Sequence, residues 1–224
     1  MTLIIAIKGK DYIIVGADSR SVTCDAITNT RFVSDIDTKL VQLNDHVCVM
    51  IAGDSERGTH LIEKFKEMVK PGQDVSEVVE EFSNFCYRES RKIIEFVPIE
   101  SRNYPHVSFI IAGMRKVRRK YSMPKIYTIR SMSGFSVGQD NNYSIMGQDT
   151  ISSYLFAKKY PKIKTWEDCI RLIVRCLSDT ESIDGDVGGK KTIALINREG
   201  FKPQDVTEIE SEIQNAGIKN IIDD

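Results

Sequence analysis

The chain has 224 residues, enough for one large domain or two small ones, and its 41% hydrophobic and 28% charged content is that of an ordinary globular protein. Its formal net charge of -1 excludes a strong field for nucleic acid or an anionic membrane surface. No apolar run approaches the roughly 20 residues that span a bilayer, and the short N-terminal run lacks the basic lead-in of a signal peptide. We therefore expect neither nucleic acid nor membrane among the partners.

The cysteines and histidines predict no metal site and no cofactor. An odd number of cysteines without CxxC spacing is typical of reduced thiols in a cytoplasmic protein. The three histidines are too far apart in the sequence to form a metal-like cluster. The residues concerned are Cys24, Cys48, Cys86, Cys169, Cys176, His46, His60 and His106.

The first twenty residues predict a hairpin in the middle of the fold. Residues 3–7 and 13–15 are apolar and rich in β-branched side chains, and residues 9–11 have the composition of a turn. Strands without a polar face are buried on both sides, so the terminus should be held at the end of a core sheet. Because Thr2 is small, Met1 can be trimmed. A free N-terminal threonine then supplies a hydroxyl nucleophile together with its own base.

The next part of the chain predicts more strands and then two helices. The polar residues 21–35 form a long loop or an irregular hairpin, and two strands follow with a turn at Asn44 and Asp45. Helical spacing of apolar residues then indicates a helix that Pro71 and Gly72 end, and a longer helix after it. A loop over residues 96–106 leads into another buried strand. The expected strands are 39–43, 47–52 and 107–113, and the expected helices are 60–69 and 76–95.

In the second half, strands precede and follow a further pair of helices. The basic residues 116–120 could bind an anion or a partner, but a solvated hairpin tip is the better interpretation given the neutral total charge. Thr165 and Asp168 resemble a capping sequence at the start of the second helix of this pair. A glycine-rich loop spans residues 184–189. The expected elements are strands at 125–129, 143–146 and 192–196, helices over 150–160 and from 165, and a final edge strand near Val206 and Thr207.

This order of elements predicts an α+β fold. Helix pairs between blocks of strands suit a four-layer αββα sandwich, with two stacked, mainly antiparallel sheets between helical layers. No composition break or flexible linker divides the chain, so we expect a single domain over residues 1–224.

Three residues at element ends can meet Thr2 in such a fold. Lys39, at the start of a strand beside the first hairpin, would lower the pKa of the Thr2 hydroxyl, and Asp18 would hold the Lys39 ammonium. Gly53, at the end of a strand, could offer its backbone N–H to a developing oxyanion because it has no side chain to block approach. The spacing predicts a nucleophile with a supporting charge pair.

At these positions the sequence resembles the β-type subunits of the proteasome, which are N-terminal nucleophile hydrolases. The resemblance rests on residues 2–9 with 13–20, on Lys39-Leu40, on residues 50–55, and on residues 184–189 followed by a strand. It implies a single N-terminal nucleophile hydrolase domain. It also implies that Thr2 attacks a peptide carbonyl, with Lys39 and Asp18 as the supporting pair and the Gly53 N–H in the oxyanion hole.

The resemblance implies further site residues. Asp184 matches the acidic residue that orders the site around the N-terminus, and Arg20 and Gly188 are supporting residues. Ile51 matches a position that lines the substrate pocket, which implies an apolar preference. No metal and no cofactor are implied.

The chain departs from the family pattern at two serine positions. Val187 stands where the family has a serine before the glycine pair. The family's GSG-type turn is represented by residues 146–149 (MGQD), where either Gln148 or Asp149 could substitute for the serine. The loops 21–35 and 96–106 are also longer than usual. These departures leave the nucleophile and its charge pair intact.

The leading hypothesis is a threonine-type endopeptidase that acts through an acyl-threonine intermediate after removal of Met1. It would cleave peptides or unfolded proteins in a cytoplasmic homo-oligomeric ring, with possible partners in other proteasome-like subunits or an ATPase. The N-terminal extension of an α-type subunit is absent. Two alternatives stay open. One is a connectase-like transpeptidase or protein ligase that uses the same threonine. The other is a non-catalytic structural subunit, which the changed serines favour and the retained charge pair disfavours.

Overall fold

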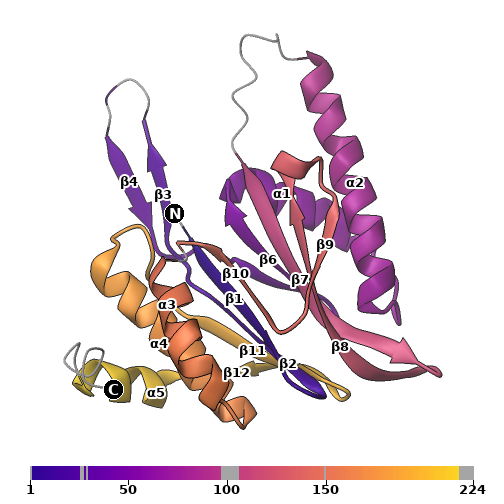
Figure 1. The fold of residues 1–224 in the computed structure, drawn as a ribbon. Helices are drawn as coiled ribbons and strands as arrows, with labels where there is room; N and C mark the ends of the chain where they lie inside the picture. Colours follow the sequence, from indigo (N-terminus) through magenta and orange to yellow (C-terminus); the bar gives the residue numbers. More distant parts are fainter. Residues whose placement is uncertain (1, 26–27, 29, 97–105, 149, 217–224) are drawn as a thin grey trace.

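Two antiparallel sheets face each other in the computed structural model of the chain, and helices cover the outer face of each (Figure 1). The structure describes residues 2–25, 28, 30–96, 106–148 and 150–216. The arrangement confirms the predicted α+β sandwich of helix, sheet, sheet and helix layers. Within the described residues, no helix is both long enough and apolar enough to cross a membrane.

The first sheet contains the N-terminal hairpin near its centre. Its strand order is β10-β1-β2-β11-β12, and every pairing is antiparallel. Leu3, Ile5 and Ile7 pack toward the helices on one side, whereas Ile4 and Ala6 pack between the sheets. This confirms a first strand buried on both faces. The strands are β1 (Leu3–Lys8), β2 (Tyr12–Ala17), β10 (Tyr143–Gly147), β11 (Thr192–Asn197) and β12 (Gly200–Gln204).

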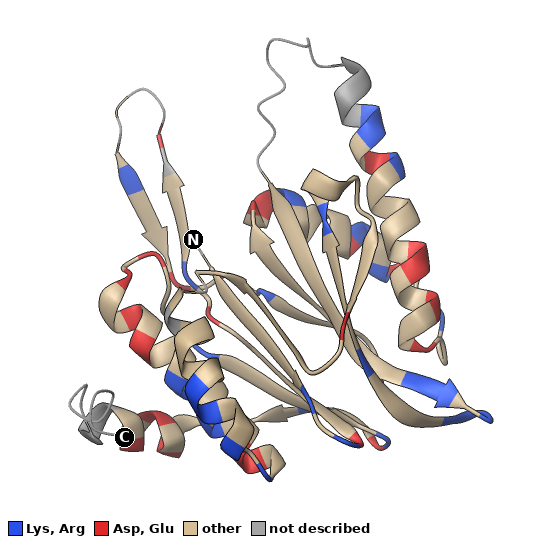
Figure 2. Cartoon of the chain, in the orientation of Figure 1, with Lys and Arg blue, Asp and Glu red and all other residues tan. Residues whose placement is uncertain are grey.

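The second sheet has the order β5-β6-β7-β8-β9 and is also antiparallel. Residues 116–120 belong to the long β7–β8 hairpin, and Arg118 and Arg119 form its turn with positive φ angles of 51° and 67°. Figure 2 shows this basic turn at the end of the hairpin, far from the N-terminus. The strands are β5 (Leu40–Asn44), β6 (Val47–Gly53), β7 (Val107–Val117), β8 (Lys120–Arg130) and β9 (Val137–Asp140).

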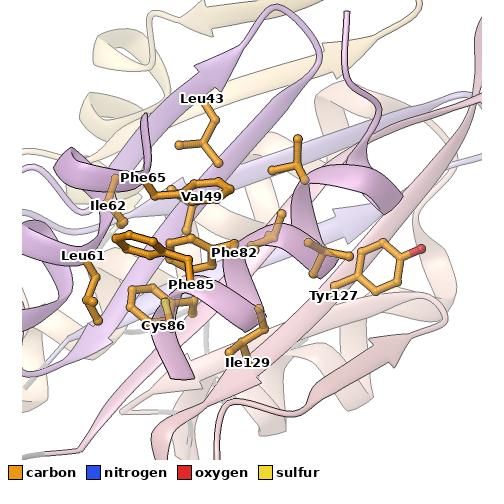
Figure 3. Close-up of a cluster of buried hydrophobic side chains, with 14 of the residues drawn as sticks. Leu43, Val49, Leu61, Ile62, Phe65, Phe82, Phe85, Cys86, Tyr127 and Ile129 are labelled. Atoms are coloured by element: carbon orange, nitrogen blue, oxygen red, sulfur yellow. The ribbon is translucent and has the colours of Figure 1, made fainter. Parts of the chain in front are cut away.

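The helices bury their apolar faces on the outer sides of the sheets. On the second sheet, Phe65 and Phe109 each meet Phe82 edge-on, with ring centroids 4.9 and 5.0 Å apart, in a cluster that Figure 3 shows. On the first sheet, the helices that follow β10 form a second core with β1, β2 and β11. The helices are α1 (Ser55–Lys66), α2 (Val75–Phe96), α3 (Thr150–Lys159), α4 (Trp166–Ile183) and α5 (Thr207–Ala216), with short 3-10 turns η2 (Ser131–Ser133) and η3 (Tyr160–Lys162).

The expected edge strand near Val206 and Thr207 is wrong. The edge strand is β12, which ends earlier, and Thr207 begins α5. The Asp205 carboxylate accepts hydrogen bonds from the Thr207 amide and hydroxyl at 3.0 and 2.7 Å, and such local bonds favour a helix start. Ile209 and Ile213 then pack against the helix-side core of the first sheet.

Two other segments add strands to the predicted order. Residues 21–35, predicted as a loop or an irregular hairpin, contain the paired strands β3 (Ser21–Cys24) and β4 (Arg31–Ser34). Strand β9 lies in a polar stretch where no strand was predicted. The loop predicted over residues 96–106 falls almost entirely outside the described residues.

The capping sequence at the start of α4 is confirmed. The Thr165 hydroxyl accepts a hydrogen bond from the Asp168 amide at 3.2 Å, and the Asp168 carboxylate accepts one from the Thr165 amide at 3.0 Å. Replacing Thr165 by alanine should lower the free energy of unfolding by about 1 kcal/mol, because the helix loses one of these bonds. Urea denaturation followed by far-UV circular dichroism would measure the change. A midpoint equal to that of the unaltered chain would contradict the prediction.

Candidate active site

Thr2 lies immediately before β1, and its backbone is held against β10. Only 5% of Thr2 is exposed. Leu3 pairs with Gly147 across the two strands, and the Thr2 carbonyl accepts a hydrogen bond from the Gln148 amide at 2.8 Å. A Cβ atom on Gly147 would lie 1.7 Å from the Thr2 carbonyl oxygen, and Gly147 has a φ of +101°. Only glycine therefore fits beside Thr2.

Asp18 and Lys39 form a buried ion pair next to Thr2. The Lys39 Nζ lies 2.9 Å from both carboxylate oxygens of Asp18, and the two residues are 3% and 2% exposed. The same carboxylate accepts the Leu3 amide at 2.9 Å and the Arg20 and Gly188 amides at 3.2 Å. Asp18 thus joins the residue after Thr2 to two loops and to Lys39. A charge in this position is stabilised because all its acceptor sites face donors.

Burial changes the acid–base properties of Lys39. The loss of hydration lowers the pKa of the Lys39 ammonium below its ordinary value, and the Asp18 carboxylate opposes this shift. Lys39 Nζ also donates to the Arg20 carbonyl oxygen. The neutral amine of Lys39 is therefore reached at a lower pH than that of a lysine in water.

Hydrogen bonds from Arg20 hold the glycine-rich loop, residues 184–189, against the candidate site. Its guanidinium makes two bonds to the Asp35 carboxylate, at 2.7 and 2.9 Å, and they hold the pKa of Asp35 below its ordinary value. The same guanidinium donates to the Val187 carbonyl at 3.3 Å, and the Arg20 amide donates to the Gly188 carbonyl at 2.9 Å. The predicted supporting residues Arg20 and Gly188 are thus in direct contact with each other, and the backbone amide of each also contacts Asp18.

Asp184 reaches Thr2 through Gln148. Asp184 caps the C-terminus of α4, and its carboxylate accepts the Asp186 amide at 2.8 Å and the side-chain amide of Gln148. Because the Gln148 backbone N–H binds the Thr2 carbonyl, one residue bridges Asp184 and Thr2. Of the two residues that the sequence left open for the missing serine, Gln148 makes this bridge. Asp149 lies outside the described residues.

A pocket of about 270 Å³ opens beside Gly53 and Gly147. It lies where the ends of β6, β7 and β8 face the end of β10. Gly53 has a φ of +94°, and a Cβ on it would meet the His106 carbonyl oxygen at 2.1 Å, so this position also requires glycine. The lining residues are Ala52, Gly53, His106, Ser108, Arg130, Ile145, Met146 and Gly147.

Ile51 and Val187 lie away from this pocket. Ile51 is 2% exposed and faces the helix layer, where its side chain packs against Gly58 of α1. It is not among the described residues that line the pocket. Val187 is buried in the helix-side core of the first sheet, so the side chain at the lost serine position contributes apolar packing.

Sequence reasoning missed the contacts of Gly147 and Arg130, and it left Gln148 as one of two candidates for the lost serine. Gly147 was placed only in the turn that represents the family's GSG-type turn, although a glycine in an apolar strand can mark the close approach of another backbone. The bridge made by Gln148 depends on a residue 36 positions away, and no local pattern encodes it. Arg130 directly follows the strand predicted over residues 125–129, and only the pairing of β7 with β8 brings it to the pocket.

Comparisons with known proteins agree with the fold and show the family. Residues 2–196 match the family described as Proteasome subunit. The chain is 29% identical to "Proteasome subunit beta type-6" of Arabidopsis thaliana, over 96% of this chain and 88% of that one. Its fold is similar to a solved structure titled "Helical Assembly of the Anbu Complex from Pseudomonas aeruginosa". That match has a TM-score of 0.77 and 14% identity, and it covers 99% of this chain and 96% of the other. Because the family match covers most of its length, this chain belongs to the proteasome subunit family.

Proposed function

We propose that the chain is a proteasome β-like threonine-type endopeptidase that cleaves peptide bonds once Thr2 has a free α-amino group. The observation that carries the proposal is the buried Asp18–Lys39 pair, whose carboxylate also binds the amide of the residue after Thr2. Burying a charge pair is costly, and such a pair adds little to stability compared with apolar packing. Its place beside a candidate nucleophile supports catalysis, because a nearby cation favours the ionised form of a hydroxyl.

In this mechanism the Thr2 hydroxyl attacks the carbonyl carbon of the substrate's peptide bond. The α-amine, with an ordinary pKa of about 7.7–8, takes the hydroxyl proton directly or through a water and later passes it to the leaving amine. Lys39 lowers the pKa of the hydroxyl through its positive charge. The Gly53 N–H donates to the developing oxyanion. Water then hydrolyses the threonine ester and frees the enzyme.

The proposal extends to assembly and location. Membership of a subunit family, together with a structural neighbour that is itself an assembly, supports an oligomer of copies of this chain in a ring. Peptides or unfolded proteins would be its substrates, and an ATPase or other proteasome-like subunits its partners. The described cysteines, Cys48, Cys86, Cys169 and Cys176, are all free and buried, which supports a reducing compartment such as the cytoplasm.

Intact-mass measurement tests the proposal directly. The native protein is expected to lack Met1 and to gain one adduct at Thr2 after treatment with an uncharged peptide β-lactone or vinyl sulfone. The Thr2→Ala protein should gain none. Retention of Met1 together with the absence of an adduct would favour a structural subunit instead. If the acyl-enzyme forms, product analysis with and without an added amine separates hydrolysis from ligation to that amine.

A further inference from the structure

We propose that Arg130 makes the pocket beside Gly53 and Gly147 a subsite for a carboxylate group of the substrate. This inference rests on the proposed function, because it names the class of substrate that the same site takes. It replaces the apolar preference expected from Ile51, whose side chain faces the helix layer instead of this pocket.

Strand register directs Arg130 into the pocket. Ala52 pairs with Ser108, and Ser108 pairs with Arg130, so the three residues form one row across β6, β7 and β8. Directly paired residues of antiparallel strands project from the same face of the sheet. Ala52 packs in the core between the two sheets, so Ser108 and Arg130 also project toward the first sheet. Arg130 has an extended backbone, with φ of -129° and ψ of 134°, so the alternation continues through it.

The side chains of the neighbouring row face the opposite side of the sheet, which confirms the direction in which Arg130 projects. Ile51, Phe109 and Ile129 are paired across the same strands, and all three belong to the core under α1 and α2. Successive residues of a strand alternate between faces, which places the row with Arg130 on the opposite side. The pocket lining includes residues of β10 from the facing sheet, as this direction requires.

The guanidinium of Arg130 is available for a ligand. Among the described residues, none makes an ion pair with Arg130, and none of those lining the pocket is acidic. The Arg130 carbonyl accepts the Phe135 amide at 2.9 Å and the Ser133 hydroxyl at 3.1 Å, and these bonds fix the strand end that carries the side chain. An arginine held in this way binds a carboxylate with two parallel hydrogen bonds.

Two of the residues that line the pocket lie next to the proposed reacting atoms. Gly53, the oxyanion donor, and Gly147, which abuts the Thr2 carbonyl, both line it. Arg130 lies two strands from Ala52, or about 10 Å along the sheet at the usual strand spacing. Because an arginine side chain is long, its guanidinium can reach across part of this distance. A bound carboxylate would then lie within one or two residues of the attacked peptide bond. The carboxylate can come from an acidic side chain or from the C-terminus of a peptide.

A binding measurement on the Thr2→Ala protein tests the proposal without requiring catalysis. The probes are amidated hexapeptides with Glu at one central position, the same peptides with Gln, and the Gln peptides with a free C-terminal carboxylate. We expect one carboxylate-bearing form to bind about tenfold to a hundredfold more tightly than its neutral counterpart in an NMR titration. The form that binds tightly identifies whether a side chain or a C-terminus is selected.

Arg130→Gln in the same background should reduce this ratio to about one. Arg88→Gln is the matched control, because Arg88 is an exposed arginine on α2 outside the pocket, and it should leave the ratio unchanged. Equal affinity for all peptides, or a preference that survives Arg130→Gln, would overturn the inference. Labelling of native Thr2 by the uncharged electrophile tests the proposed function separately, so either proposal can fail while the other stands.

Discussion

Replacing Gly147 by alanine is expected to abolish acylation of Thr2 and to lower the free energy of unfolding by at least about 3 kcal/mol. The new methyl group would lie 1.7 Å from the Thr2 carbonyl oxygen, at a backbone φ of +101°. A methyl carbon and a carbonyl oxygen cannot lie this close, so β10 must move away from β1. The Gln148 amide then loses its bond to the Thr2 carbonyl, and Thr2, the proposed nucleophile, leaves its position.

The control variant Gly134→Ala separates the effect of the steric contact with Thr2 from the effect of a positive φ angle. Gly134 also has a positive φ, +63°, but a Cβ there would meet nothing within 4 Å. Its replacement should cost only about 1–2 kcal/mol and leave acylation unchanged. Urea denaturation and intact-mass labelling of both variants provide the comparison. Equal losses of stability in the two variants would show that the contact with Thr2 has no effect.

Replacing Lys39 by methionine is expected to lower the free energy of unfolding by about 3–5 kcal/mol and to slow acylation strongly. The substitution keeps the length and packing of the side chain but leaves the buried Asp18 carboxylate without its cation. The three backbone amides that remain, from Leu3, Arg20 and Gly188, satisfy hydrogen bonds without supplying a full charge. Typical domains have 5–15 kcal/mol of stability, so the variant should stay folded in the cold with a lower melting temperature.

The matched control is the exposed pair of Arg171 and Glu212, whose nitrogen and oxygen lie 2.5 Å apart at the surface. Arg171→Met should cost no more than about 1 kcal/mol, because solvent already screens that pair. Differential scanning calorimetry measures both variants, and the rate of adduct formation by mass spectrometry measures acylation. Lys39→Met with unaltered acylation would remove Lys39 from the mechanism.

The sequence predicts the central elements of the fold because their residues have one dominant pattern. The apolar runs that form β1, β6 and β11 are buried on both faces, and their composition predicts strands. Strand β9 (VGQD) has no such run, and pairing with β8 alone makes it a strand. The segment after β12 was wrongly predicted because Asp205, a local signal for the helix that starts at Thr207, was overlooked, and because the packing of Ile213 is a tertiary feature.

The sequence predicts several residues of the candidate site, but it does not predict the hydrogen bonds that join them. Thr2, Asp18 and Lys39 follow from positions at element ends, and the structure joins Asp18 to Lys39. The substrate-pocket role of Ile51 stays a prediction taken from a resemblance, and the alternation along β6 turns its side chain to the helices. Arg130 lines the pocket although the sequence predicted no role for it, because its position depends on the register of two strand pairs.

The Asp18 carboxylate has a consequence for synthesis of the chain. One of its donors, the Gly188 amide, is 170 positions further along, and β11, which pairs with β2, follows that glycine. The N-terminus is made first, and contacts between distant positions form late in folding. A nascent chain therefore carries Thr2 beside an incomplete set of donors until most of the polypeptide has emerged. Assembly of the candidate site is in this way timed by translation.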